Sequence, residues 1–138
     1  MRRIFIFLTV IFLSLLVLQA KPRKKNIENL PLLNTIWMLE EIFDAPVSEK
    51  TETAYIVFHE NYRFTGDFGC NIFFGEFGFG KKRISLDYLG ATKNLCADME
   101  IEKQYFKALK YEITHYYIEK NNLYLLHKLK VVCKFKGK

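Results

Sequence analysis

The sequence lacks acidic residues where it begins, and it has few cysteines. No Asp or Glu occurs in residues 1–25, which hold six of the 21 Lys and Arg residues. The other 15 basic residues are balanced by 15 acidic ones, so residues 26–138 carry no net charge. A duplex-binding domain usually has a basic patch of its own, and we therefore expect no nucleic-acid partner. Because no cysteine precedes Cys70, a lipid-modified cysteine near the N-terminus is excluded.

Patterns that carry familiar chemistry are also missing. No Gly-rich phosphate loop precedes a predicted helix, and no Ser or Cys lies in a nucleophile-elbow pattern. The three histidines, His59, His115 and His127, include no pair at i and i+4, whereas a zinc site needs converging ligands. The Cys-x-x-Cys spacing of redox sites is absent. We expect a protein that is not an enzyme and that uses no cofactor or metal.

The first 20 residues have the layout of a secretory signal peptide. Arg2-Arg3 precedes an apolar run over residues 4–18, and Ala20 is a small residue at the cleavage point. The run of about 15 residues is shorter than the ~20 that span a bilayer. We expect cleavage after residue 20, a basic linker over residues 21–29 and an exported domain over residues 30–138, located in the periplasm or cell envelope.

Two features of this segment leave another interpretation open. Leu18 is larger than the small residue usually found two positions before the cleavage residue, here Ala20, and a basic cluster such as that at residues 21–25 can slow translocation. An uncleaved segment would anchor the protein in the membrane. The cluster would then add attraction to anionic lipid, about 1 kcal/mol for each basic residue.

Residues 30–138 read as strands, one helix and further strands. Residues 44–53 are a polar loop, and Asp98 is a candidate N-cap for a helix over residues 99–111. That helix places Ile101, Tyr105, Ala108 and Leu109 on one face. In the last strand Val131, Cys133 and Phe135 alternate with lysines and point to one side. The expected strands are residues 32–39, 55–59, 62–68, 72–79, 84–88, 114–119, 123–126 and 130–136.

This order predicts a β-rich α+β fold. Strands that follow one another through short turns favour an antiparallel sheet. We expect the sheet to be curled or to form a partly open barrel, with one main helix packed on it. We also expect a monomer.

Four motifs occur in order along this domain. The first is Thr35-Ile36-Trp37-Met38-Leu39, and the second runs from Phe64 through Gly66, Gly69, Cys70 and Asn71 to Gly75. The third is Thr92-Lys93-Asn94-Leu95-Cys96, and the fourth is the helix that follows Asp98. Together they resemble the META domain, the family of HslJ-like heat-shock proteins. Two positions depart from it: Asn34 replaces a usual Gly, and the turn at His127-Lys128-Leu129 lacks Asp-Gly.

The resemblance implies a small exported or envelope-associated domain that is linked to stress response in some members. It brings no agreed catalytic mechanism, so no catalytic residue is carried over. Cys70 and Cys96 are the two family cysteines, and we favour a disulfide between them, because export supplies an oxidising compartment. A redox or metal pair is the alternative. Cys133 is expected to be a buried small hydrophobe rather than a nucleophile.

Asn71 and the aromatic residues leave further alternatives open. For Asn71 we favour hydrogen bonds to local backbone, or a left-handed conformation, over contact with a ligand. The adjacent Phe73 and Phe74 must face opposite sides of a strand. Either both faces of the sheet are covered, or one face exposes an apolar patch. An exposed apolar face would bind an envelope protein or an apolar ligand. This non-enzymatic binding role is our main hypothesis. A membrane-anchored surface protein and a thiol-based enzyme are the alternatives.

Overall fold

The computed structural model describes residues 29–47, 53–96, 99–111 and 113–138. The predicted signal peptide, nearly all of the predicted linker and the candidate N-cap Asp98 lie outside these residues. No helix in the described ranges is both long enough and apolar enough to cross a membrane.

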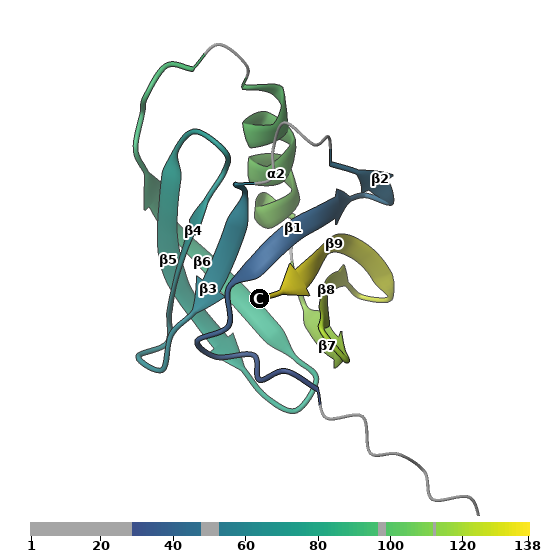
Figure 1. Ribbon diagram of the computed structural model, residues 1–138. Coiled ribbons are helices and arrows are strands. Elements are labelled where there is room, and N and C mark those ends of the chain that lie inside the picture. Colours follow the sequence, from purple (N-terminus) through teal and green to yellow (C-terminus); the bar gives the residue numbers. More distant parts are fainter. Residues whose placement is uncertain (1–28, 48–52, 97–98, 112) are drawn as a thin grey trace, which may run out of the picture.

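One antiparallel sheet dominates the molecule, as the sequence predicts (Figure 1). Its strands follow the order β6-β5-β4-β3-β1-β9-β8-β7, and the short β2 pairs with β1 alone. Apart from the contacts of β1 with β9 and with β3, neighbours in the sheet follow one another in the chain and join through short turns. The strands are β1 (Trp37–Ile42), β2 (Ala45–Pro46), β3 (Tyr55–Phe58), β4 (Arg63–Asp67), β5 (Ile72–Phe79), β6 (Ile84–Ala91), β7 (His115–Glu119), β8 (Asn122–His127) and β9 (Lys130–Gly137).

The sheet curls into a barrel in which the two terminal strands, β6 and β7, meet along a seam. Hydrogen bonds close one end of this seam, and the rest of it is open. The Ile84 amide donates to the Thr114 carbonyl at 3.2 Å, and the Tyr116 amide donates to the Lys82 carbonyl at 3.1 Å. Past Ile84 no described strand pairs with this edge of β6. The predicted partly open barrel is therefore confirmed.

The helix α2 (Glu100–Lys110) packs on the sheet through the face that the sequence predicts. Tyr105, Ala108 and Leu109 are buried, while Ile101 is half-buried. The N-cap position falls on Met99, which makes no side-chain capping bond. Acidic residues in the first turn and basic residues in the last turn suit the helix dipole.

The core lies inside the curled sheet and is rich in aromatic side chains. Tyr105 reaches from α2 to Phe68, Phe73 and Phe135, with ring centroids 5.3, 5.6 and 6.1 Å away. Edge-to-face and tilted pairs of this kind add to the energy of area burial. These contacts attach the helix to both halves of the sheet.

Two local predictions were wrong. The loop expected over residues 44–53 contains the two-residue strand β2, which folds back on the end of β1. In β9 the pairing shifts by one residue next to Leu125, so Val132 and Cys133 are both fully buried and Val131 is only half-buried. A bulge inserts an extra residue and breaks the two-residue period, which the alternation of lysines does not reveal.

Candidate functional site

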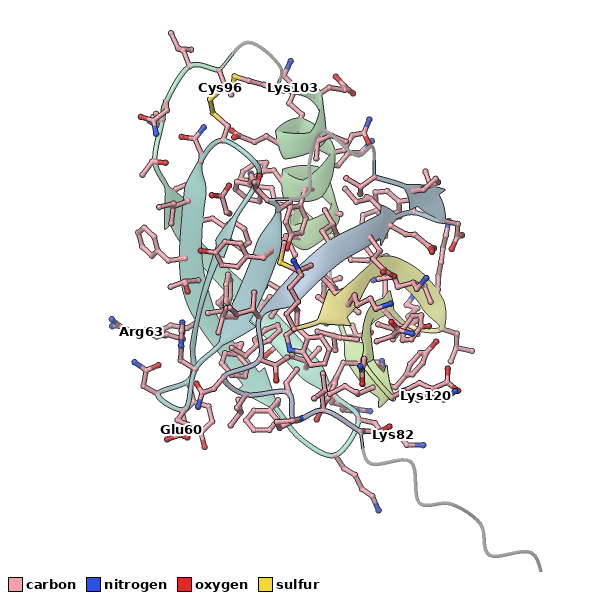
Figure 2. The ribbon with its side chains drawn as sticks, in the orientation of Figure 1. Glu60, Arg63, Lys82, Cys96, Lys103 and Lys120 are labelled. Carbon is pink, nitrogen blue, oxygen red and sulfur yellow. A yellow bond between two sulfur atoms is a disulfide. The ribbon has the colours of Figure 1, made fainter. Side chains whose placement is uncertain are left out.

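The Gly-Cys-Asn motif meets the Thr92–Cys96 segment and α2 at one end of the sheet. Asn71 lies just before β5, and its side chain is 1% exposed. It is one of two buried polar residues in the described part of the chain, with Thr35 as the other. Its side chain contacts both of the other segments. Figure 2 shows Cys96 and Lys103 close to this end of the molecule, beside the helix.

Every polar atom of the Asn71 side chain has a partner. Its Oδ1 accepts hydrogen bonds from the Thr92 hydroxyl and the Asn94 amide, both at 2.7 Å. Its Nδ2 lies 2.9 and 3.0 Å from the two carboxylate oxygens of Glu102 and 3.1 Å from the Asn94 carbonyl. The Asn71 backbone amide also donates to Glu102 at 3.1 Å. A buried amide that is satisfied in this way fixes the positions of its partners.

The prediction that Asn71 bonds to backbone was right, but the prediction that these bonds are local was wrong. The residue does bond to backbone, but its partners lie 23 and 31 positions along the chain rather than in its own turn. The left-handed residue of this bend is Gly69, with φ of 99°, and not Asn71. Sequence reasoning missed Glu102 as a partner, because an acidic residue in a first helical turn already has an explanation in the helix dipole.

A disulfide joins Cys70 to Cys96 beside this network, as the sequence predicts. The two Cα atoms are 6.3 Å apart, and 26 positions separate the residues. The bond lies on the surface, since Cys70 is half-buried and Cys96 is exposed. The disulfide and Asn71 therefore hold the same two segments together, one by a covalent link and one by hydrogen bonds.

Two motif glycines give room to aromatic rings on the neighbouring strand. Gly66 pairs with Phe73 and Gly75 pairs with Phe64 across β4 and β5. A Cβ at either glycine would overlap the ring of its partner and a backbone carbonyl. Phe64 and Phe73 can consequently lie flat over the sheet and fill the core, which explains why these positions need glycine.

The first motif ties the start of β1 to the segment before it. The Thr35 hydroxyl donates to the Pro31 carbonyl at 2.7 Å, and Trp37 Nε1 donates to the Leu32 carbonyl at 3.0 Å. Trp37 is fully buried. Asn34 has a φ of 60°, a conformation that Gly adopts freely and that Asn tolerates. The departure from the family pattern at Asn34 thus preserves the backbone geometry.

The remaining nucleophilic and metal-ligating candidates do not converge. Cys133 is fully buried, and desolvation raises the pKa of its thiol well above the usual range. His59 bonds to the Thr65 hydroxyl at 2.8 Å and His115 to the Thr114 hydroxyl at 2.9 Å, while the His127 ring packs edge-on against Tyr111. Within the described ranges no three His, Cys, Asp or Glu side chains are grouped as metal ligands.

Apolar side chains lie on the outside of the sheet on either side of β4, and we call this set the outer patch. Phe73 is fully buried, whereas its neighbour Phe74 is 47% exposed and Ile72 is 52% exposed. The strand pairing puts Phe74 beside Thr65 and Ile72 beside Asp67, both on β4. Val57 and Tyr55 lie on β3, on the far side of these two polar residues. The outer patch consists of Met38, Tyr55, Val57, Ile72 and Phe74 from β1, β3 and β5.

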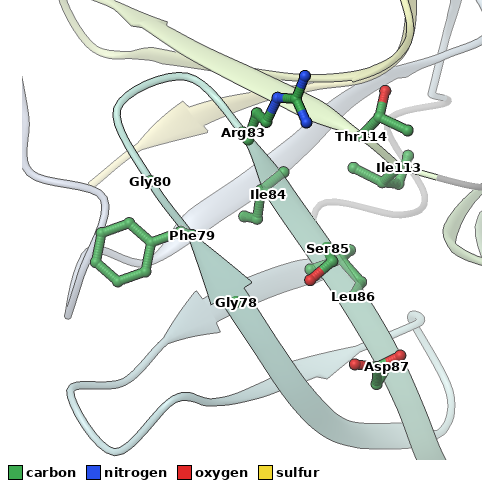
Figure 3. Close-up of a pocket in the computed structure, with 10 residues that line it drawn as sticks. All are labelled: Gly78, Phe79, Gly80, Arg83, Ile84, Ser85, Leu86, Asp87, Ile113 and Thr114. Carbon is green, nitrogen blue, oxygen red and sulfur yellow. The ribbon is translucent and has the colours of Figure 1, made fainter.

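Two hollows lie along β6. The seam pocket, of about 480 Å³, lies where the seam begins to open (Figure 3). Figure 3 shows Ile113 and Thr114 facing Ser85 and Leu86 across it. The second hollow, which we call the helix pocket, measures about 360 Å³ and lies between the end of β6 and α2. Its lining comprises Phe68, Gly90, Ala91, Thr92, Lys93, Glu102, Lys103 and Phe106.

Comparisons with known proteins agree with this geometry. The family model of the META domain matches residues 30–138. The fold is similar to a protein from Burkholderia xenovorans solved by NMR (TM-score 0.59, 19% identity, 88% of this chain and 99% of that chain). It is also similar to the crystal structure of a DUF4847 family protein from Bacteroides vulgatus (TM-score 0.57, 15% identity, 76% and 93%). A third similar structure, also solved by NMR, has a TM-score of 0.56 at 23% identity (74% and 87%). The comparison with curated proteins finds no match.

Proposed function

Because the chain belongs to the META domain family, we propose that it is an exported, non-enzymatic domain of the cell envelope that binds a partner protein through the outer patch. The HslJ-like resemblance supports a role linked to stress. The apolar N-terminal run and the Cys70–Cys96 disulfide support export, since disulfides persist in oxidising compartments.

The outer patch is the observation that carries the proposal. Phe74 and Ile72 each expose about half of their surface on the outside of the sheet, although the same strand buries Phe73 and Phe77 completely or nearly so. Polar side chains border these two on β4, and Arg63 and Glu76 lie opposite each other in the register at one end. An apolar centre with a polar rim is the usual composition of a protein interface.

The cysteines argue against a thiol-based enzyme. Cys70 and Cys96 are joined to each other, and the thiol of Cys133 is buried with a raised pKa. A reactive cysteine is instead accessible and has a lowered pKa. The membrane-anchored alternative differs from the proposal only in the fate of the N-terminal segment. N-terminal sequencing of the protein from the envelope separates the two, because an intact Met1 would favour the anchor.

Site-specific photo-crosslinking in cells tests the proposed surface. A photoreactive side chain at Glu76, on the rim of the outer patch, should give a discrete adduct with one protein. The double substitution I72S/F74S should abolish that adduct while the domain stays folded. A photoreactive side chain at Lys130, at the start of β9, is the control for position.

Leu129 provides the control for lost hydrophobicity, because it is 95% exposed and lies far from the patch in sequence and in the sheet. The substitution L129S should leave the Glu76 adduct unchanged. Equal adducts from Glu76 and Lys130, or an adduct from Glu76 that survives I72S/F74S, would rule out the outer patch as the binding surface.

A further inference from the structure

The geometry points to the helix pocket as a binding site for an apolar anion, a single-chain fatty acid. This site lies on the inner side of the sheet, between β6 and α2, and does not depend on the proposed partner protein. It combines an apolar floor, polar groups that are already satisfied and two lysines at its mouth.

The floor of the helix pocket is aromatic. Phe68 and Phe106 meet edge-on there, with ring centroids 5.8 Å apart. Ala91 pairs with the inward-facing Phe73, so its methyl group points to the same inner side. Because Ala91 is small, the space between β6 and α2 stays open. A volume of about 360 Å³ falls within the range of small-molecule sites.

The Thr92 hydroxyl and the Glu102 carboxylate of the inner wall already have partners within the protein. The Thr92 hydroxyl donates to Asn71 and accepts from the Ile72 amide at 3.1 Å. The Glu102 carboxylate receives the amide and the side chain of Asn71. The motif network thus holds the wall rigid and uses up its hydrogen-bonding groups, so the interior of the pocket favours an apolar chain.

The mouth of the pocket is cationic. Lys93 and Lys103 are exposed, and within the described ranges neither forms an ion pair with a carboxylate. They come from opposite sides, one following β6 and the other in α2. Two ammonium groups against the single engaged carboxylate of Glu102 leave a net positive charge, which suits a carboxylate head group. The chain of such a ligand would lie on Phe68 and Phe106.

Titration with sodium decanoate tests the site on the protein as it is purified from the cells that express it. Two-dimensional amide NMR should show shifts confined to residues near Ala91, Lys93 and Phe106. Decanol, which has the same chain without the charge, should bind at least about tenfold more weakly, as should decanoate to the double variant K93A/K103A. The variant K81A/K82A removes two exposed lysines elsewhere and should bind as the parent does.

A second variant tests the apolar floor separately. A91L fills the pocket and should abolish the shifts while both lysines remain. If A91L fails to fold, K93R/K103R takes its place, and retained binding in this charge-preserving variant supports the site. Equal binding of decanol and decanoate would overturn the proposal. So would binding only to vesicles of phosphatidylglycerol, which would assign the lysines to a membrane surface, and so would shifts centred on Tyr55 and Val57, which lie on the outer side of β3 away from the pocket.

Discussion

At the scale of single residues, Asn71 connects more of the structure than any other polar side chain described here. It joins the bend before β5 to Thr92, Asn94 and Glu102, and it is almost fully buried. Such a side chain contributes less through the net energy of its bonds than through the cost of leaving its partners unpaired. The cost falls mainly on Glu102, whose carboxylate would keep the Asn71 backbone amide but lose the side-chain donor.

We expect Asn71→Ala to lower the free energy of unfolding by about 3 kcal/mol, because it empties a buried site and removes the side-chain partner of Thr92, Asn94 and Glu102 together. Chemical denaturation of the oxidised protein measures the change. Asn61→Ala is the matched control, since its exposed side chain accepts one local hydrogen bond from the Arg63 amide. The control should change stability by less than about 1 kcal/mol. If the two substitutions lowered the free energy of unfolding equally, the Asn71 network would contribute no more to stability than a single exposed hydrogen bond.

Cys133 makes stability depend on alkaline pH. Burial raises the pKa of its thiol, whereas an unfolded thiol ionises near pH 8.5. Its contribution is complete below that value, and it is lost as the pH rises, because only the unfolded chain releases the proton. Between pH 7.5 and 9.5 the parent should lose about 1.4 kcal/mol through this group. For Cys133→Val, the free energy of unfolding should fall by about 1.4 kcal/mol less over the same pH range. If the free energy of unfolding of the two proteins depended on pH in the same way, the burial of the thiol would be contradicted.

At the scale of elements, the disulfide and the helix form one unit. Cys70 precedes β5 and Cys96 precedes α2, so the bond restrains the connection that places the helix. Closing a loop of this length is worth roughly 3 kcal/mol in the chain-entropy model.

Cys70→Ser should therefore be less stable than the parent by about that amount when both are unfolded without reductant. With reductant present, the two proteins should unfold at nearly the same denaturant concentration. The comparison contains its own control, because reduction removes the bond from the parent alone. Equal stability without reductant would mean that the two cysteines are not paired in the protein.

The open part of the seam predicts a difference within β6. The Ile84 amide is bonded across the seam to Thr114, and every second residue directs its amide to the same edge. The Leu86 amide therefore faces the seam where no described strand pairs with it. Amide hydrogen exchange should be faster at Leu86 than at Ile84. Similar protection at both positions would mean that the seam is closed in solution.

Sequence patterns predicted the elements well and their long-range details poorly. Alternation and β-branched residues located the strands, and helical spacing located the buried face of α2. The bulge in β9 could not be foreseen, since a bulge is set by pairing with β8 rather than by the strand's own residues. Glu102 could not be foreseen either, because its bond to Asn71 spans 31 positions. The residues next to Asn71 or to Glu102 in the sequence do not indicate that bond.

The Gly-Cys-Asn motif was expected to shape a local bend, and its role in the folded chain extends further. Gly69 does supply the left-handed turn. Gly66 makes space for a core ring, Cys70 is bonded to Cys96, and Asn71 binds the helix. Family resemblance found these positions together, but only the fold explains why they occur together.

At the scale of the whole molecule, the protein has two surfaces on different sides of one frame. The outer patch lies on the outside of β1, β3 and β5, and the helix pocket lies between β6 and α2. The motif network and the disulfide border the pocket, and the network meets the outer patch only through the backbone of Ile72. We expect substitutions in the patch to change partner binding without changing decanoate binding, and the reverse for substitutions at the pocket.

The central claim is that this domain acts outside the cytoplasm in its oxidised form. Intact-mass spectrometry of the protein isolated from the envelope fraction, without reductant, tests it most directly. The account predicts a chain that begins at Lys21 and weighs two hydrogens less than its fully reduced form. One thiol, Cys133, should react with alkylating reagent only after unfolding. A chain that retains Met1 and carries three free thiols would contradict the account.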